Sequence, residues 1–195
     1  MIRIIQDIHG NYDKYLELIK DAEYSVQLGD FGFDYDCLKD VDPAKHKILG
    51  GNHDNYDKIV DVPHYLGDYG QQNLGGLNFF FVRGAHSIDY KDRLIGISWW
   101  KEEELSHLQC LDAMDCYAIY KTDIVISHDA PVFLYQQLGC ANLNNTLTNM
   151  TLRNMWSIHK PSKWFFGHHH KYFNRKVGPT KFISGEMCSY YDLEI

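Results

Sequence analysis

Five short apolar runs, each followed closely by aspartate, asparagine or histidine, constrain the fold of this chain more than any other feature. The runs lie at residues 2–5, 26–28, 48–49, 124–126 and 164–166. The polar residues that follow them, run by run, are Asp7 and His9; Asp30; Asn52, His53 and Asp54; His128 and Asp129; and His168, His169 and His170. Short apolar runs bounded by glycine and polar residues are typical of buried strands. Because sites in open α/β sheets collect at the carboxyl ends of strands, we expect these side chains to converge.

Other patterns place helices and further strands between these runs. Apolar residues recur at helical spacing in two segments, and β-branched and aromatic residues gather in others. The patterns predict helices over residues 12–19 and 147–158, strands over 77–82 and 94–98, and a hairpin over 172–177 and 181–184. The acidic run 102–104 fits the first turn of a helix. Strands that alternate with helices indicate an α/β protein with layered sheets and outer helices.

Composition and charge exclude several classes of function. The chain has 195 residues and no linker-like segment, so we expect a single domain over residues 1–195. Nineteen Lys and Arg stand against 26 Asp and Glu, and the net charge of −7 argues against strong binding of duplex nucleic acid. No apolar run approaches the ~18 residues of a membrane span. The N-terminal sequence lacks the apolar segment of an export signal, and we expect a cytoplasmic protein.

The residue types that follow the runs indicate a metal site. The seven candidate ligands are Asp7, His9, Asp30, Asn52, His128, His168 and His170. They combine oxygen and imidazole donors without a thiolate, which suits manganese, iron, zinc, nickel or cobalt, and not calcium alone. A catalytic metal takes about three protein ligands, so this set fits two metals ~3.5–4 Å apart that share a carboxylate. Such a pair is suited to displacement at phosphorus, in which a metal-bridging hydroxide attacks.

The motifs DIHG, GDFGFD, GGNHD, SHDAP and GHHH resemble, in this order, the signature motifs of the calcineurin-like metallophosphoesterases. The family patterns are DxH, GDxxD, GNHD, a single histidine after a strand, and GHxH. The resemblance extends from Asp7 to His170, and the segments VRGAHSIDYKDR and GISWWKEEEL resemble small stand-alone members from bacteria and phages. This resemblance implies a four-layer α-β-β-α sandwich with two mixed sheets and outer helices.

The resemblance also implies a role for each motif residue. The first metal would be held by Asp7, His9, Asp30 and His170, and the second by Asp30, Asn52, His128 and His168. Asn52 and His53 would contact the phosphoryl group, and His53 would protonate the leaving oxygen, a step worth ~10²–10⁴-fold. Asp54 would orient His53 and raise its basicity. We expect two divalent metal ions, manganese first, with iron, zinc, nickel or cobalt as alternatives.

One departure from the family pattern bears on the substrate. Protein phosphatases of the family read GDxxDRG, where the arginine grips the phosphate, whereas residues 29–36 contain no arginine. Arg83 and Arg93 are candidates to replace it, with an ordinary surface position as the alternative, and we include Arg93 among the substrate-binding residues. We expect His169 outside the ligand set. His86 is either a turn residue or a contact at the rim of the substrate site.

The sequence therefore predicts a binuclear metal-dependent phosphoesterase that acts on small phosphomono- or phosphodiesters. Alternatives with the same chemistry are a protein or nucleotide phosphatase with a dedicated substrate, a nuclease, and a cyclic-nucleotide phosphodiesterase. A non-catalytic scaffold of the same fold is the alternative from another class. Scaffolds of this kind usually have broken ligand sets, whereas every ligand position is filled here. The oligomeric state is left open.

Overall fold

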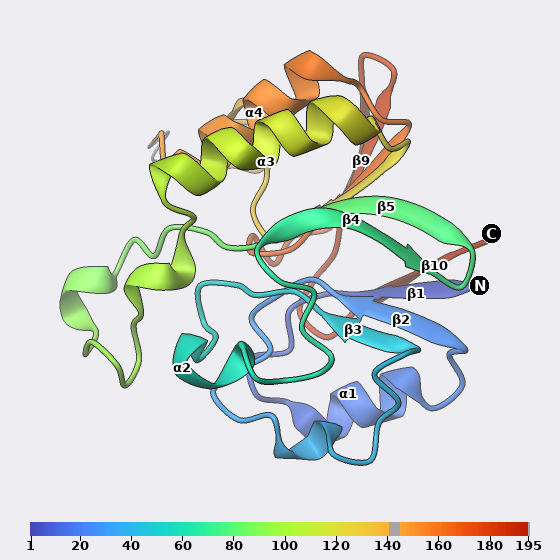
Figure 1. The fold of residues 1–195 in the computed structure, drawn as a ribbon, viewed down its shortest axis with the longest axis vertical. Helices are drawn as coiled ribbons and strands as arrows, with labels where there is room; N and C mark the ends of the chain where they lie inside the picture. The colour runs from blue at the N-terminus through green and yellow to red at the C-terminus, as the bar shows by residue number, and fades with distance from the viewer. Residues whose placement is uncertain (141–144, 195) are drawn as a thin grey trace.

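The computed structural model describes residues 1–140 and 145–194, and it contains two β-sheets packed face to face (Figure 1). The four-stranded sheet has the order β10 (Tyr190–Leu193), β1 (Ile2–Ile5), β2 (Tyr24–Gln27), β3 (His46–Ile48). The six-stranded sheet has the order β4 (Tyr69–Leu74), β5 (Leu77–Val82), β6 (Ile124–Ser127), β7 (Lys163–Phe166), β9 (Thr180–Ser184), β8 (Phe173–Val177). Both sheets are mixed, because β10, β4 and β8 pair antiparallel while the remaining pairs are parallel.

Helices cover the outer face of each sheet (Figure 1). On the side of the six-stranded sheet lie α3 (His107–Tyr120) and α4 (Leu147–Ile158), and on the side of the four-stranded sheet lie α1 (Tyr12–Ile19) and the short α2 (Tyr56–Ile59). Single 3₁₀ turns occur at Asp36–Leu38, Tyr90–Asp92, Lys101–Glu103 and Val132–Leu134. Among the described residues, no helix has both the length and the apolar character needed to cross a membrane.

The alternation of side chains along β5 explains the layers. Phe79 and Phe81 pack in the core between the two sheets, whereas Phe80 and Val82 pack in the core beneath α3 and α4. A third apolar core, to which Ile5 belongs, lies between the four-stranded sheet and α1. Three apolar layers thus join four layers of secondary structure. The predicted α-β-β-α sandwich with two mixed sheets and outer helices is confirmed.

Capping residues fix where the two longest helices begin. Ser106 forms a capping box with Gln109 at the start of α3, and Thr146 forms one with Asn149 at the start of α4. Each box satisfies backbone N–H groups that the first helical turn leaves without partners. The predicted helix over residues 147–158 therefore has the boundaries expected from the sequence.

Two segments differ from the sequence prediction. Residues 94–98 form no strand, because they bond to one another in a loop that projects from the body of the fold, where Ile95 is 79% exposed (Figure 1). The acidic run 102–104 does not begin a helix. Glu103 lies in a 3₁₀ turn and is buried, where it accepts hydrogen bonds from Ser87, and the helix begins only after Ser106.

Candidate metal centre

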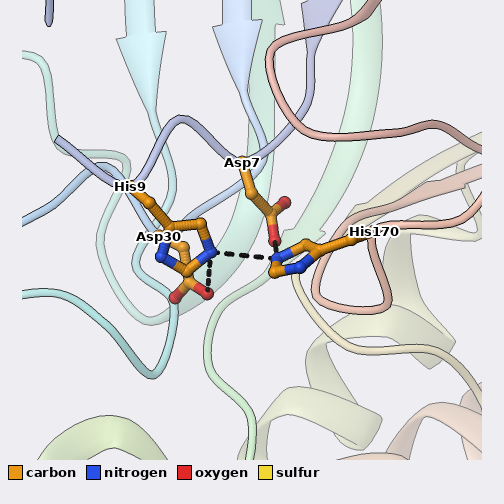
Figure 2. A group of neighbouring side chains, drawn as sticks. All are labelled: Asp7, His9, Asp30 and His170. Atoms are coloured by element: carbon orange, nitrogen blue, oxygen red, sulfur yellow. Dashed lines mark hydrogen bonds and ion pairs between the residues drawn. The ribbon is translucent and has the colours of Figure 1, made fainter. Parts of the chain in front are cut away.

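The loops that follow β1, β2 and β7 bring four side chains together at one edge of the sheets. Figure 2 shows these residues, Asp7, His9, Asp30 and His170, turned toward one another. His9 Nε2 lies 2.9 Å from His170 Nε2 and 3.4 Å from Asp30 Oδ2. His170 Nε2 lies 3.0 Å from Asp7 Oδ2. One ligand atom from each residue falls within 4.8 Å of the others, a spacing compact enough for one cation.

A second group of side chains shares Asp30 with the first. His128 Nε2 lies 3.3 Å from Asp30 Oδ1, and with His168 these residues again place ligand atoms within 4.8 Å of one another. The Asn52 oxygen joins this group, because Oδ1 lies 3.1 Å from His128 Nε2 and 2.9 Å from His168 Nδ1. The structure thus brings together all seven residues that the sequence indicated as ligands, in two groups with Asp30 in common.

The backbone is strained at four of these residues. His9, Asp30, His168 and His170 have φ angles of 44°, 56°, 63° and 50°, in the left-handed region that residues other than glycine rarely adopt. In the described part of the chain only two other non-glycine residues share this conformation. Such conformations cost ~1–3 kcal/mol each and cluster at functional sites. Four of them at one point indicate that the fold gives up stability to place these side chains.

Two glycines allow the loops to approach the ligands closely. A Cβ atom at Gly51 would meet the Asp30 carboxylate and would lie 2.7 Å from His128 Cε1. A Cβ atom at Gly167 would collide with the Asp7 carboxylate. A side chain at either position would therefore displace a carboxylate of the site.

The donor atoms fit divalent cations. Asp7 Oδ1 is buried and accepts no hydrogen bond from the residues that the structure describes, a costly state for a carboxylate unless a cation compensates it. His128 Nδ1 donates to the Leu28 carbonyl at 2.8 Å, which directs Nε2 toward Asp30. Burial opposes ionisation of Asp30, but the nearby imidazoles, His128 first, hold the pKa of its carboxyl well below the ordinary value. Ionised carboxylates with imidazole nitrogens suit borderline divalent metals.

His53 lies beside these groups and is held by Arg93. The His53 ring centroid is 4.9 Å from that of His9, and Arg93 Nη2 is 2.6 Å from His53 Nε2. Arg93 Nη1 also donates to the Asn52 carbonyl oxygen at 3.1 Å, and Nε donates to Asp89 at 3.0 Å. Burial, together with the Arg93 charge, lowers the pKa of His53. Of the two candidate arginines, Arg93 is therefore the one at the site.

The expected role of Asp54 is wrong, because its carboxylate does not contact the His53 ring. The carboxylate instead accepts hydrogen bonds from the backbone N–H groups of Asp30 (2.9 Å), Gly32 (2.9 Å) and Gly51 (2.7 Å) and from the Tyr35 hydroxyl (3.3 Å). Burial and the neighbouring Asp30 carboxylate raise the pKa of Asp54 to about 7. Asp54 therefore joins the loops after β2 and β3 and helps to hold the left-handed conformation of Asp30.

Two other basic residues have structural partners. Arg83 is buried, where its Nε donates to Asp68 at 2.5 Å, so it is not free to contact a substrate. His169 lies outside both ligand groups, as expected, with Nε2 3.1 Å from Asp129 Oδ1. Asp129 also accepts the Tyr135 hydroxyl. The Asp129 carboxylate therefore anchors the loop that carries the two ligand histidines on either side of His169.

No protein-family model and no curated protein matches the sequence. Solved structures match its fold. Phosphopantetheinyl hydrolase from Mycobacterium tuberculosis aligns with a TM-score of 0.54 at 13% identity, over 96% of this chain and 89% of that chain. A hypothetical protein from Thermus thermophilus aligns with a TM-score of 0.52 at 13% identity, over 95% and 76% of the two chains. The chain has the calcineurin-like metallophosphoesterase fold.

In this metallophosphoesterase fold, two cavities meet at His53. One of about 390 Å³ is lined by His9, Tyr12, Phe33 and Lys58 in addition to His53. The other, of about 350 Å³, is lined by Asn52, His86, Ile88, Arg93 and His168 in addition to His53. His86 therefore lies at the rim of the site. Each cavity opens onto one of the two ligand groups, because His9 belongs to the first group and His168 to the second.

Ser87 and Glu103 also belong to the candidate site, a role that sequence reasoning did not assign to them. Asn52 Nδ2 donates to Ser87 Oγ at 3.0 Å, and Ser87 donates in turn to Glu103. The available signal was the position of Ser87 shortly after the apolar run 77–82. Because β5 is parallel to β6, the carboxyl end of β5 lies at the same edge as the ligands.

Proposed function

We propose that the protein is a metal-dependent phosphoesterase that works with two divalent cations. The first would be held by Asp7, His9, Asp30 and His170, and the second by Asp30, Asn52, His128 and His168. The observation that carries this proposal is the sharing of Asp30 by two compact ligand groups. When bound, such a pair of cations supplies Lewis acidity toward phosphoryl oxygens and a nucleophile derived from water at neutral pH.

In this proposal Arg93 and His53 contact the substrate. Arg93 carries a fixed charge and several N–H donors, which suit the oxygens of a phosphoryl group. Its Nη2 approaches the His53 ring at the edge of the ligand groups, so a phosphoryl oxygen that enters there lies within reach of both side chains. In its protonated form, His53 gives a proton to the leaving oxygen, so that the alcohol departs as a neutral molecule. Because the pKa of His53 is lowered, this form is the minor one at neutral pH.

The two cavities favour small phosphodiesters as substrates. With phosphorus next to His53, one ester group can lie along Phe33 and Tyr12 and the other along His86 and Ile88. The net charge of −7 slows the approach of long polyanions, which disfavours duplex DNA and leaves short or cyclic nucleotide diesters. A dedicated monoester phosphatase is the second candidate, because the Arg93 guanidinium can donate charged hydrogen bonds to the oxygens of a dianionic phosphate.

Metal-depleted protein reloaded with Mn²⁺, Ni²⁺ or Zn²⁺ provides the test. We expect metal-dependent hydrolysis of nitrophenyl phosphate and of bis-nitrophenyl phosphate at comparable rates, with nucleotides and phosphopeptides assayed in the same series. Manganese is our first choice for the native metal. Absence of both metal binding and turnover with every substrate would contradict the proposal and favour a non-catalytic scaffold.

A further inference from the structure

Asn52 is the one amide among the seven ligand residues, and its side chain can face the site in two ways. Only the oxygen can bind a cation, whereas the NH₂ group would repel it. Asparagine therefore needs a device that selects one orientation, which a symmetric carboxylate does not need. The structure has Nδ2 turned away from the site, where it donates to Ser87 Oγ at 3.0 Å. Oδ1 faces His128 and His168.

Glu103, which lies behind Ser87, determines which atom donates in the hydrogen bond between Asn52 and Ser87. Its Oε1 accepts the Ser87 backbone N–H at 2.8 Å, and its Oε2 accepts the Ser87 hydroxyl at 2.7 Å. A carboxylate only accepts, so the single hydroxyl proton of Ser87 is committed to Glu103. Ser87 Oγ can then only accept a hydrogen bond from Asn52, so the Asn52 NH₂ group must be the donor. We propose that Glu103, acting through Ser87, is a positioning residue that turns the Asn52 oxygen toward the second cation.

The surroundings give this chain of hydrogen bonds little freedom. Glu103, Ser87 and Asn52 are 3%, 2% and 5% exposed, so water does not compete for their hydrogen bonds. The backbone between them is braced at both ends. Gly84 N–H donates to the Gly50 carbonyl at 2.8 Å, and Ala85 N–H donates to the Glu103 carbonyl at 3.1 Å. The three loops that carry the chain of hydrogen bonds are thus held at fixed spacing.

The inference rests on the proposed metal site, and Glu103→Gln tests it. Glutamine can donate to Ser87 Oγ, which frees the hydroxyl proton for Asn52 and permits the wrong amide orientation. We expect Mn²⁺ binding, measured by calorimetry with elemental analysis, to weaken by ~10–100-fold for one of two ions, the usual effect of losing a partner of a ligand. Glu102→Gln removes the same charge from the exposed neighbour and is the matched control. Ser87→Ala should reproduce the loss of affinity with little change in volume.

The Asn52→Asp background separates orientation from a merely structural role. Aspartate has oxygen at both positions, so no orientation is wrong, and Glu103→Gln should leave Mn²⁺ affinity unchanged there. Equal affinity of Glu103→Gln and Glu102→Gln in the Asn52 protein would overturn the inference. An equal loss in both backgrounds would also overturn it, because it would assign Glu103 to loop packing alone. Failure of the unaltered protein to bind Mn²⁺ would instead contradict the proposed function itself.

Discussion

Arg93 Nη2 lies 2.6 Å from His53 Nε2, although the two residues are 40 positions apart in the chain. The loop after β5 returns to the ligand groups at this point, and a second bond to the Asn52 carbonyl holds the guanidinium there. The fixed positive charge of Arg93 and the imidazole of His53 therefore occupy one side of the site together. This pairing determines what each residue can do for a phosphoryl group.

Replacement of Arg93 by alanine should lower kcat/KM by ~10–100-fold, because charged hydrogen bonds to the substrate are lost. The loss should be larger with nitrophenyl phosphate than with bis-nitrophenyl phosphate, since the monoester carries the greater charge. Arg153→Ala, at an exposed position of α4, is the control. Equal kinetics in the two variants would remove Arg93 from the site. A monoester preference above ~100-fold that collapses in Arg93→Ala would identify a dedicated phosphatase.

His53→Ala should separate binding from chemistry. His53 is not among the seven candidate ligands, so the metal content should be unchanged, while kcat should fall by ~10²–10⁴-fold if His53 is the general acid. Nitrophenyl esters should suffer less than alkyl esters, because nitrophenolate hardly needs protonation. Equal losses with both leaving groups would exclude the general-acid role and leave contact with the phosphoryl group as the function of His53.

Asp54→Asn should act on stability and not through His53. The carboxylate accepts three backbone N–H groups, and an amide would turn its own NH₂ toward one of these donors. We expect unfolding by denaturant to be easier by ~1–3 kcal/mol, with the exposed Asp61→Asn as control. In the double variant, the fold-changes in kcat caused by Asp54→Asn and by His53→Ala should multiply. If Asp54→Asn abolished the effect of His53→Ala instead, Asp54 would act through His53.

His46 should make the protein less stable in mild acid. It is buried on β3 with Nδ1 2.9 Å from Ser25 Oγ, and burial lowers its pKa below the ordinary value of about 6.5. The unfolded chain therefore takes up more protons as the pH falls, so this part of the stability is present above about pH 6.5 and is lost below it. The free energy of unfolding of His46→Asn should fall less than that of the unaltered protein between about pH 7.5 and pH 5. The exposed His107→Asn should keep the original pH dependence, and an unchanged slope in His46→Asn would contradict the assignment.

The candidate ligands could be foreseen because their signal is local. Each follows a short buried strand, and parallel strands of one fold present their carboxyl ends at a common edge. The role of Asp54 could not be foreseen in the same way. It follows His53 in the sequence, but the turn directs the two side chains apart. Asp54 points toward the backbone of the loop after β2, and His53 points toward Arg93.

Contacts between distant loops were the other limit of sequence reasoning. The apolar pattern of residues 94–98 resembled a strand, but no neighbouring strand is available to pair with it in the structure as described. The sequence placed Glu103 in the acidic first turn of a helix, whereas its burial depends on a partner 16 positions away. The edge strand β10 has a mixed polar sequence, so its pairing with β1 leaves little periodic signal.

Metal content of the unaltered protein and of Asp30→Asn, measured by elemental analysis after reloading with Mn²⁺, tests the central claim most directly. Asp30 places Oδ2 3.4 Å from His9 Nε2 and Oδ1 3.3 Å from His128 Nε2, so one substitution removes charge from both ligand groups. The expected result is two ions per chain in the unaltered protein and in the exposed control Asp36→Asn, and the loss of at least one ion with near-background activity in Asp30→Asn. Two ions per chain and normal turnover in Asp30→Asn would contradict the account.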